Sequence, residues 1–338
     1  MVPTVSVVIP TLNRLSFLKE TIESLHRQTF RDWEAVVVDD GSTDGSWEWL
    51  VGEARQDARV RAIRRMEKRP EAQGAQVCRN VGWSDARSHY LLFLDSDDML
   101  SSKCLAGRVT ALDRNPGLDF VVGQCEHFTR RPGDCPDEIW SKWDDGQDDL
   151  DAFLGTGIPW QTSGPLWRWR ALDAIGPWDE SLVHVGHDHE FHVRALCRGL
   201  KYLKLPGIDY YWRHVREDSL SALESFKRHH ADGGMILAFT KIIATVSLAG
   251  QWTAQRRKTQ RQEAINLATR CRLWGGTLRT ASRAIKAARG QGLLSWPEQM
   301  EITAALAGWF RVADKIPSMA YLNRRYCVAH AVARGSEA

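Results

Sequence analysis

The sequence predicts an α/β protein in which a mostly parallel β-sheet is flanked by helices and followed by an α-helical C-terminal extension. Within the first hundred residues, β-branched apolar runs alternate with segments whose apolar residues recur at helical spacing. Strands and helices in alternation are typical of a parallel sheet that is covered on both faces. From about residue 219 the strand signals fade, and the rest of the chain is mostly helical in pattern and locally basic. We therefore place a domain boundary near residue 220.

Four strands and three helices are expected in the first hundred residues. The strands are short apolar runs that end in polar or turn-forming residues: 5–9, 33–38, 60–63 and 90–94. The helices carry apolar residues three or four positions apart: 14–28, 46–54 and 75–86. Residues 116–165, rich in Asp, Gly, Pro and Trp, are expected to be irregular. Near the end of the chain, Ser295-Trp296-Pro297-Glu298 predicts a capping box that opens one of the last helices.

Length and composition indicate a folded protein of one large domain or two. Of the 338 residues, 43% are apolar and 26% are charged, which is ordinary for a globular chain. The seven cysteines are scattered and form no C-x-x-C pair, which argues against a zinc ribbon or a disulfide framework and favours a reducing cytoplasm. No signal peptide is visible, and the apolar run 235–252, interrupted by Lys241, is expected to be a buried helix. The fifteen tryptophans fit an aromatic core better than a set of sugar-binding platforms.

Polar clusters follow the first, second and fourth expected strands. Ligands of parallel α/β sheets bind at the carboxyl ends of the strands, so the three clusters together indicate one site. The fourth strand runs directly into Asp95-Ser96-Asp97, whose two carboxylates can share one Mg²⁺ or Mn²⁺ and, through it, a substrate phosphate. Alone, such a triplet is more often a solvated turn. Its neighbours have to decide between the two interpretations.

Those neighbours also suit a nucleotide. Pro10-Thr11-Leu12-Asn13-Arg14 ends the first strand, and Asp39-Asp40-Gly41-Ser42 ends the second. An acid at such a position can accept hydrogen bonds from a base N–H or a ribose hydroxyl, and Gly41 lets the chain turn sharply beside it. Arg79, on the helix before the fourth strand, can pair with phosphate, although by itself it would be taken for a surface arginine.

In this order and spacing, four segments resemble the family-2 glycosyltransferases, whose GT-A fold is Rossmann-like. The segments are Val5–Arg14, Val36–Ser46, Arg79–Gly82 and Tyr90–Asp98. The resemblance covers about residues 3–220. It implies a GT-A catalytic domain over residues 1–220, with a nucleotide-sugar half of about 1–100 and an acceptor half of about 101–220. Residues 221–338 would then form the helical, basic C-terminal region.

The resemblance also implies roles for individual residues. The nucleotide-sugar site would comprise Pro10, Thr11, Asn13, Arg14, Asp40, Arg79, Asp95, Ser96 and Trp160. Within it, Thr11, Asn13 and Asp40 would hold the base, usually uracil. Asp97 would be the main ligand of Mn²⁺ or Mg²⁺, and Asp95 would face both the ribose and the metal. Trp160 would lie under the donor sugar or the acceptor.

Residues 186–191, Gly-His-Asp-His-Glu-Phe, are similar to the segment in which this family carries an acidic pair at the start of a helix under the acceptor. Asp188 matches the second acid, which implies that it is the catalytic base. An acceptor hydroxyl is a poor nucleophile until a carboxylate takes its proton. His187 replaces the usual first acid, and it would tune Asp188 or contact the acceptor. Glu190 is the alternative base, and a solvated acidic turn is the alternative to any site.

Residues 211–221 resemble the closing segment of the family, in which a histidine followed by serines reaches back to the metal and the diphosphate. His214 would complete the coordination of the metal, although a lone histidine is as often structural. Arg213 or Arg216 would clamp phosphate oxygens. Residues 176–179 match a further landmark of the family, and we expect a structural turn there.

Basic residues are concentrated between Arg256 and Arg289, with ten Lys or Arg against one acid, Glu263. Apolar residues recur there at steps of four and three, interrupted at Gly275-Gly276, which predicts amphipathic helices with a basic face. Three interpretations stay open: plain packing with a solvated basic face, attraction to anionic lipid, and, least favoured, nucleic-acid binding. We expect a cytoplasmic protein with no nucleic-acid partner, in peripheral contact with the inner face of the membrane at most.

The sequence therefore predicts an inverting glycosyltransferase of the hexosyl or N-acetylhexosaminyl type. Its donor would be a nucleotide-diphosphate sugar, expected to be UDP-linked. Its acceptor would be a hydroxyl of a glycan or of a lipid-linked or cell-surface polymer precursor. Two alternatives stay open. A nucleotidyltransferase is disfavoured by the lack of a Gly-rich phosphate loop near the first strand, and a degenerate carbohydrate-binding module is conceivable because of His187. A dehydrogenase is excluded, since no G-x-G-x-x-G follows the first strand.

Overall fold

The computed structural model describes residues 2–135, 138–140, 143, 146, 148–155, 157–183, 185–214 and 223–312, without the side chains of 223–226 and 308–312. The chain divides into two compact units, Met1–Asp218 and Ser219–Ala338. Each unit has its own hydrophobic core and is described here by itself.

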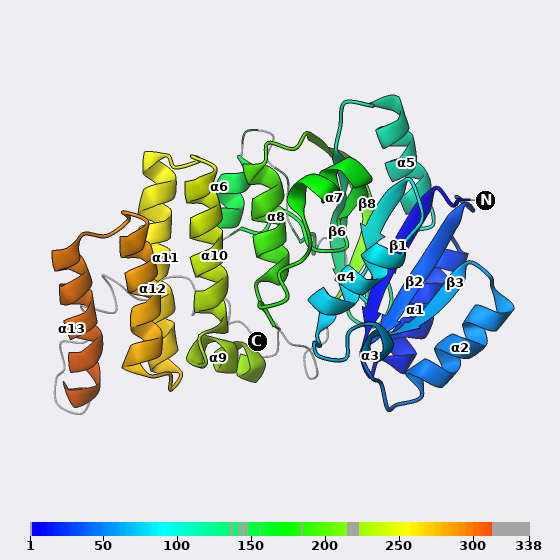
Figure 1. Cartoon of the computed structure of the whole chain (residues 1–338). Coiled ribbons are helices and arrows are strands. Elements are labelled where there is room, and N and C mark those ends of the chain that lie inside the picture. Colours follow the sequence, from blue (N-terminus) through cyan, green and yellow to red (C-terminus); the bar gives the residue numbers. More distant parts are fainter. Residues whose placement is uncertain are drawn as a thin grey trace. The chain divides into compact units, whose positions relative to one another are not determined.

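The described strands of the first unit form one mixed sheet in the order β3-β2-β1-β4-β7-β6-β8-β5 (Figure 1). The strands are β1 Val5–Thr11, β2 Trp33–Asp39, β3 Val60–Arg64, β4 Tyr90–Phe93, β5 Met99–Leu100, β6 Phe120–Phe128, β7 Pro165–Arg168 and β8 Tyr202–Arg213. Strands β3, β2, β1 and β4 run parallel, whereas β7 is antiparallel to both β4 and β6. Strand β8 is parallel to β6, and the short β5 is antiparallel to β8.

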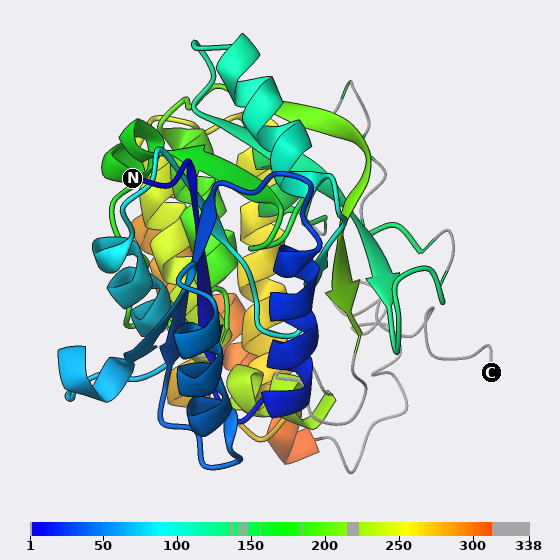
Figure 2. The ribbon, with the colours of Figure 1, turned by 90° about the vertical axis from the view of Figure 1, so that its right-hand side faces the viewer.

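The helices of the first unit connect and cover these strands. They are α1 Leu15–His26, α2 Ser46–Gln56, α3 Arg65–Lys68, α4 Ala75–Asp85, α5 Cys104–Arg114, α6 Asp149–Leu154, α7 Trp169–Ile175 and α8 His187–Cys197. Figure 2 shows the deep-blue α1 and the cyan α4 on opposite faces of the sheet. Together with the helices of the second unit, this confirms the predicted fold class.

Strand β1 lies in the interior, and its alternate side chains serve two different faces. Val7 and Ile9 belong to the same buried cluster as Leu18 and Ile22 of α1. On the other face, α4 comes very close to the sheet at Gly82. A Cβ atom at Gly82 would lie 2.4 Å from Cγ1 of Val8, well inside van der Waals contact. The absence of a side chain at Gly82 therefore sets how closely α4 packs on β1.

The expectation of an irregular segment over residues 116–165 is wrong for its first part. Phe120–Phe128 forms β6, a nine-residue strand that pairs with β7 and β8. Only the triplet Phe120-Val121-Val122 reads as apolar, and half-buried polar residues follow it. Such a run is too short to identify a strand from sequence. The strand extends to Phe128 because its backbone pairs with β8, about eighty residues later.

The described part of the second unit is helical, with α9 Leu223–Ala231, α10 Gly234–Leu248, α11 Ala254–Leu273, α12 Leu278–Gly290 and α13 Trp296–Val312. Its core includes Ile243 of α10, Leu267 of α11 and Ile285 of α12. The apolar run predicted to be a buried helix is α10, which buries Ile236, Phe239 and Ile243. Among the described residues, no helix has both the length and the apolar character needed to cross a bilayer.

The predicted capping box at the start of α13 is confirmed. The Ser295 N–H donates to Oε2 of Glu298 at 2.8 Å, and the Glu298 N–H donates back to Oγ of Ser295 at 3.4 Å. The two residues satisfy donors that a helix start otherwise leaves unpaired.

Candidate active site

The register of the parallel strands brings three loops to one edge of the sheet. Thr11 at the end of β1 is level with Asp39 at the end of β2, and β4 is the other neighbour of β1. The first residue beyond β2 stays attached to β1, since the Asp40 N–H donates to the carbonyl of Thr11 at 2.9 Å. The polar clusters that the sequence places after these strands therefore lie side by side, as expected for ligand binding at the carboxyl ends of parallel strands.

The loop after β2 uses both of its carboxylates within the protein. Asp39 is fully buried and accepts from the N–H groups of Gly41 and Ser42, at 3.0 and 3.1 Å. Asp40 accepts from Nε of Arg65 at 2.5 Å and from the Gly74 N–H at 2.8 Å. The side chains of Asp40 and Arg65 are 8% and 6% exposed, so this is a buried ion pair. Both oxygens of Asp40 thus already have protein donors, whereas the resemblance implies a carboxylate open to a nucleobase.

The loop after β1 is joined to the loop after β2 by Asn13. Asn13 has a left-handed backbone, with φ of 52°. Its N–H donates to Oγ of Ser42 at 2.9 Å, and its Oδ1 accepts from the Thr43 N–H at 2.8 Å. Asn13 therefore braces two loops of the edge. Pro10 and Thr11 are buried in β1, and no hydrogen-bond partner of the Thr11 hydroxyl is found among the described residues.

The loop after β4 keeps its two outer carboxylates accessible. Asp95 accepts from Nη2 of Arg79 at 2.5 Å and is 32% exposed. Asp97 lies 3.9 Å from Nη1 of Arg14 and is 26% exposed, whereas Ser96 between them is buried. Burial and the neighbouring charge of Asp95 raise the pKa of Asp97. Two carboxylates that repel each other at an accessible loop are suited to sharing a cation.

Two buried residues fix this loop. The sequence analysis did not predict the role of Asp98 and predicted a different role for Arg213. Asp98 is buried and accepts from Oγ of Ser163 at 2.6 Å, and burial raises its pKa well above the usual range. Arg213, expected to clamp phosphate, is 4% exposed and donates through Nε to the carbonyl of Asp97 at 3.0 Å. Its Nη2 is paired with Glu20 at 2.5 Å. Arg213 is therefore a loop-holding residue, and Arg216 lies outside the described residues.

Of the three predicted metal ligands, Asp95 and Asp97 lie on one loop and His214 lies elsewhere in the described part of the chain. Asp95 and Asp97 fit a hard divalent cation, because both are oxygen ligands on one loop, and burial together with the charge of Asp95 raises the pKa of Asp97. The described residues contain no group of three or more His, Cys, Asp or Glu side chains arranged to hold a metal ion. The ring of His214 instead faces those of His127 and Trp212, at centroid distances of 6.3 and 5.4 Å. His214 is thus not gathered with the two aspartates.

Arg79 connects this loop to α8. Its side chain is 3% exposed, its Nη2 binds Asp95, and its guanidinium lies over the indole of Trp178 at 4.7 Å. Trp178 stacks on Phe191 of α8 at 4.1 Å and meets the ring of His187 edge-on at 6.0 Å. Nε and Nη1 of Arg79 are buried and have no hydrogen-bond partner among the described residues. Two unused donors on a buried guanidinium are suited to an anionic ligand.

Asp188 lies in the first turn of α8, after Gly186, which adopts a left-handed φ of 73°. Its Oδ1 accepts from the N–H of His189 at 2.8 Å. Burial by itself raises the pKa of Asp188, but His187, His192 and the His189 N–H outweigh it, and the net pKa lies below the usual value. Burial lowers the pKa of His192 to about 3, so that imidazole is neutral. Asp188 is therefore ionised at neutral pH, as a proton acceptor has to be.

Glu190, the alternative base, has a structural part. It is 5% exposed and pairs with Nη2 of Arg194 at 2.9 Å. Arg194 also donates to the carbonyls of Ile175 and Pro177, both at 2.9 Å. Glu190 therefore helps to attach α8 to the turn after α7, and the structure argues against its being the base.

Trp160 is a core residue in the structure, and its predicted place under the sugar is wrong. It is 1% exposed, with the rings of Phe120, Phe153 and Tyr202 at centroid distances of 6.1, 5.0 and 5.4 Å. No face of the indole is open to a sugar. Residues 176–179 form the expected turn, in which Gly176 has φ of 81° and the Trp178 N–H donates to Oδ1 of Asn80 at 2.9 Å. The contact of Trp178 with Arg79 was missed, because nothing in the sequence links positions a hundred residues apart.

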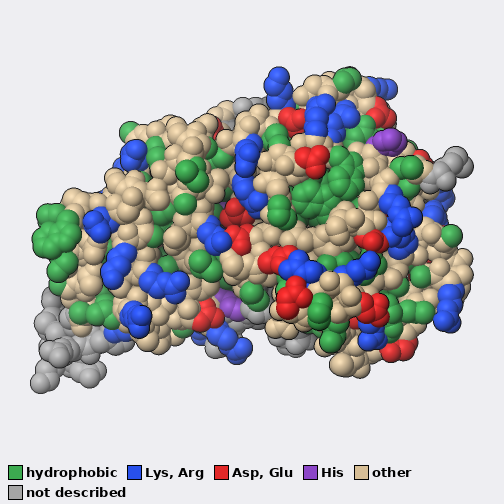
Figure 3. All heavy atoms as spheres, viewed as in Figure 1, with side chains coloured by type: hydrophobic (Ala, Val, Ile, Leu, Met, Phe, Trp, Pro, Cys, Tyr) green, Lys and Arg blue, Asp and Glu red, His purple; other side chains and the backbone are tan. Residues whose placement is uncertain are grey.

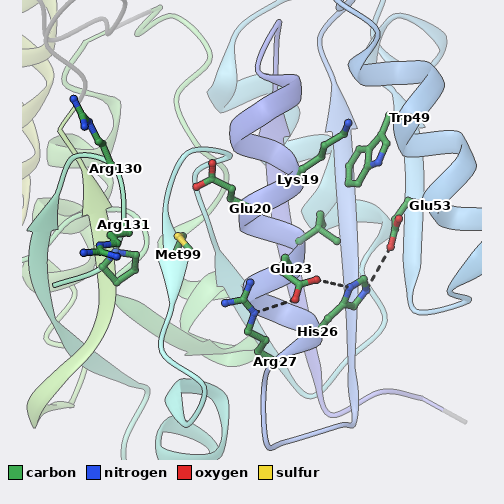
Figure 4. A pocket seen from close by; sticks show the side chains of 12 residues that line it. Lys19, Glu20, Glu23, His26, Arg27, Trp49, Glu53, Met99, Arg130 and Arg131 are labelled. Carbon is green, nitrogen blue, oxygen red and sulfur yellow. Dashed lines mark hydrogen bonds and ion pairs between the residues drawn. The ribbon is translucent and has the colours of Figure 1, made fainter. Parts of the chain in front are cut away.

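A groove of about 510 Å³ opens elsewhere on the first unit, along the outer side of α1. It is lined by α1, by Trp49 and Glu53 of α2, by Met99, and by the loop of residues 130–132. Figure 4 shows His26 between Glu23 and Glu53, its ring nitrogens 3.8 and 3.5 Å from their carboxylates. None of the predicted site residues lines this groove. Among the described residues, Glu20 and Met99 of the groove both contact Nη2 of Arg213, which holds the loop of Asp97.

Comparison with known sequences agrees with the geometry. Residues 6–167 match the family described as "Glycosyl transferase family 2". The chain is 38% identical over 121 residues to the "Uncharacterized glycosyltransferase EpsJ" of Bacillus subtilis, a match that covers 36% of this chain and 33% of that protein. It is 32% identical over 129 residues to "Glycosyltransferase GlyG" of Streptococcus pneumoniae, covering 38% and 41%. The matches thus span between a third and two fifths of these relatives.

Solved structures share the fold. S. aureus TarS 1–349 in complex with UDP is 16% identical, covers 92% of both chains and superposes with a TM-score of 0.59. The mannosyltransferase PcManGT of Pyrobaculum calidifontis, solved with GDP-Man and Mn²⁺, is 18% identical, covers 98% of this chain and 87% of that one, and has a TM-score of 0.54. With the strand order, the loop of Asp95 and Asp97 and the matched segment in agreement, residues 6–167 belong to glycosyl transferase family 2, and the first unit has the GT-A fold.

Proposed function

We propose that the chain is an inverting, metal-dependent glycosyltransferase that moves a sugar from a nucleotide-diphosphate donor to an acceptor hydroxyl. One observation carries this proposal: the series of contacts from Asp95 through Arg79 and Trp178 to the start of α8. It connects a pair of accessible carboxylates to an ionised carboxylate, Asp188, by way of a buried arginine with unused donors. A site for the leaving diphosphate and a site for the attacking hydroxyl would thus adjoin.

On the donor side, Asp95 and Asp97 would hold Mg²⁺ or Mn²⁺. A bound divalent cation offsets the negative charge that develops on a departing diphosphate. Arg79 would donate from Nε or Nη1 to a donor oxygen while Nη2 stays on Asp95. Arg14, 3.9 Å from Asp97, supplies a second positive charge at the same loop. Pro10, Thr11, Asn13 and Ser96 would form the walls around the nucleotide.

On the acceptor side, Asp188 would take the proton of the attacking hydroxyl. The acceptor oxygen then forms a bond to the anomeric carbon as the bond from that carbon to the diphosphate oxygen breaks. The proton ends on Asp188, and the nucleoside diphosphate leaves with the bonding electrons. A single displacement of this kind inverts the anomeric carbon. Asp188 suits the role because it is ionised and because the N-terminus of α8 holds it.

Relatives guide the choice of donor and acceptor. TarS has been solved with UDP and with UDP-GlcNAc, which favours a UDP-linked hexose or N-acetylhexosamine. PcManGT was solved with GDP-Man, which makes a GDP-sugar the main competitor. Two relatives have names that point to acceptors at the cell surface. The chain is 32% identical over 124 residues to the "GalNAc(5)-diNAcBac-PP-undecaprenol beta-1,3-glucosyltransferase" of Campylobacter jejuni, and 36% over 96 residues to the "Putative teichuronic acid biosynthesis glycosyltransferase TuaG" of Bacillus subtilis. We infer a glycan acceptor that is lipid-linked or part of a surface polymer.

The test is a donor-hydrolysis screen across UDP-, GDP- and dTDP-linked sugars, with Mn²⁺, with Mg²⁺ and with EDTA. The expected result is metal-dependent hydrolysis of a UDP-sugar, with the β-anomer released from an α-linked donor and identified by NMR at early times. The matching nucleoside diphosphate should raise the melting temperature only when the metal is present. Metal-independent stabilisation, or release of the α-anomer, would overturn the proposed metal or the proposed inversion respectively.

A further inference from the structure

Helix α12 of the second unit carries a row of cations. The basic residues follow one another at steps of four, three and three, which places them on one face of a helix. All of them are exposed: Arg279, Arg283, Lys286 and Arg289. The opposite face is buried in the core of the unit: Ala281, Ala284, Ile285 and Ala288. Helix α12 contains no acid. We call the four cations the α12 stripe.

The stripe is not used in the fold. No ion pair or side-chain hydrogen bond joins any of its four side chains to another residue in the part of the chain that the structure describes. Two basic residues of α11 differ. Arg261 pairs with Glu298 at 2.6 Å, and Arg270 lies 3.6 Å from Glu263. Among the described residues, Arg261 and Arg270 of α11 thus have acidic partners, whereas the four cations of α12 have none.

The surroundings of the stripe suit an anionic partner. Residues 223–312 contain fourteen Lys or Arg against five Asp or Glu. Figure 3 shows blue cationic side chains spread over the visible face of α10–α13, with few acidic ones among them. Because the apolar face of α12 is buried, the helix cannot turn that face towards lipid, and its contact with a partner has to be electrostatic.

An exposed aromatic residue favours a lipid surface over a soluble polyanion as the anionic partner. Trp296 opens α13, six residues after α12 ends, and it is 62% exposed. Met300, one turn later, is 47% exposed. Trp is enriched at the headgroup level of bilayers, where its ring is half in an apolar and half in a wet environment. A soluble polyanion gives such a pair no comparable environment.

From these observations we infer that the α12 stripe docks the chain on an anionic lipid surface, with Trp296 at the headgroup level. Each Lys or Arg near such a surface contributes about a fivefold gain in partitioning. The stripe therefore suffices for reversible, salt-sensitive binding. The inference goes beyond the proposed sugar transfer and is independent of it, because binding is measured without donor or acceptor.

The experiment measures co-sedimentation of the full chain with vesicles. Vesicles of phosphatidylcholine alone are compared with equimolar phosphatidylcholine and phosphatidylglycerol, at low salt and at about 0.5 M salt. The expected result is binding only to the anionic vesicles and only at low salt, since salt screens exposed charges. The triple variant Arg279→Gln, Arg283→Gln, Lys286→Gln should lose about a hundredfold in partitioning. Trp296→Ala should lose less.

The matched control removes three exposed cations from the first unit, in the variant Arg55→Gln, Lys103→Gln, Arg114→Gln. It should keep its binding within about threefold. Both variants are checked for an unchanged melting temperature, and Arg279→Gln alone, with a proportionally smaller loss, replaces the triple variant if that unfolds. Equal loss in the two variants would overturn the inference, because net charge and not the stripe would then be responsible. Binding to soluble polygalacturonate but not to the vesicles would assign the stripe to an anionic polymer and overturn it as well.

Discussion

Acids cluster at the carboxyl ends of both β2 and β4, yet the protein uses them in different ways. Asp39 and Asp40 after β2 are consumed by turn N–H groups and by the buried Arg65. Asp95 and Asp97 after β4 remain 32% and 26% exposed. Helix α8 repeats the contrast within three residues: Glu190 pairs with Arg194, whereas the partners of Asp188 among the described residues are the His189 N–H and nearby imidazoles. In both comparisons the acids proposed for the site are more exposed than the structural ones. An ion pair alone does not decide the use, since Asp95 itself pairs with Arg79.

The contrast within α8 predicts the largest effect. Asp188→Asn should lower turnover by about two to four orders of magnitude while donor and metal binding persist, because the amide cannot accept the acceptor proton. The measurement is kcat with the donor found in the screen, together with donor affinity by calorimetry. Glu190→Gln is the control. It should lose stability, because it weakens the buried pair with Arg194, but keep the turnover of the folded fraction. The reverse pattern would make Glu190 the base.

A substitution in the loop after β2 should change the stability of the fold. Asp40→Ala leaves the buried Arg65 without its partner and should destabilise the fold by about 3–5 kcal/mol. Urea unfolding followed by circular dichroism measures this loss. Asp40→Asn, which keeps an acceptor for the Gly74 N–H, should recover part of it. If Asp40→Ala instead kept full stability and lost nucleotide affinity, Asp40 would be a base contact, as the resemblance implies.

A substitution in the loop after β4 should change the affinity for the metal–nucleotide complex. Asp97→Asn should weaken the affinity for the metal–nucleotide complex at least ten- to hundredfold, the range found when even outer-shell partners of a metal site are lost. The pKa of Asp97 is raised in the fold, so its ionisation at neutral pH costs stability, and the neutral amide should leave stability equal or higher by up to about 1 kcal/mol. Calorimetry with nucleoside diphosphate and Mn²⁺, paired with a melting curve, tests both parts. A large loss of stability would place Asp97 in the same class as Asp40.

The smallest expected effect concerns the departure at position 187. His187 helps to lower the pKa of Asp188, and a carboxylate in its place would repel the charge of Asp188 and raise that pKa. Activity needs the ionised carboxylate, so it falls as the pH drops through the pKa of Asp188. His187→Asp should therefore move the acidic limb of the pH–rate profile upward by about one unit. His187→Asn should move it less. A downward shift in His187→Asp would exclude the electrostatic part assigned to His187.

Local pattern predicted the parallel half of the sheet well, because strands β1, β2 and β4 are dense apolar runs whose identity does not depend on distant partners. The position of the loop of Asp95 and Asp97 follows from the same pattern. The local sequence pattern could not show which acids already have partners within the protein. Asp40 is bound by Arg65 and Gly74, 25 and 34 residues later, and only the folded chain brings them together.

The same limit explains the other corrections. Trp160 matches a sequence landmark, yet the rings of Phe120 and Tyr202, each about forty residues away in the chain, help to bury it. Arg213 is chemically suited to phosphate, and the fold places its guanidinium against Glu20 and the carbonyl of Asp97. Trp160 and Arg213 thus have side chains of the predicted chemical type, but their positions in the fold give them structural roles.

Gly82 has a consequence for how the site tolerates mutation. Arg79 lies one turn before Gly82 on the same helix, so the distance between α4 and β1 also sets how deep the arginine reaches. A methyl group at position 82 would meet Val8 at 2.4 Å and force the helix away from the sheet. The guanidinium would then withdraw from Asp95 although no residue of the site has changed. In a mutational scan, substitutions at position 82 should therefore be tolerated as poorly as those at position 79. Val8→Ala, which removes the clashing methyl groups, should restore activity to Gly82→Ala.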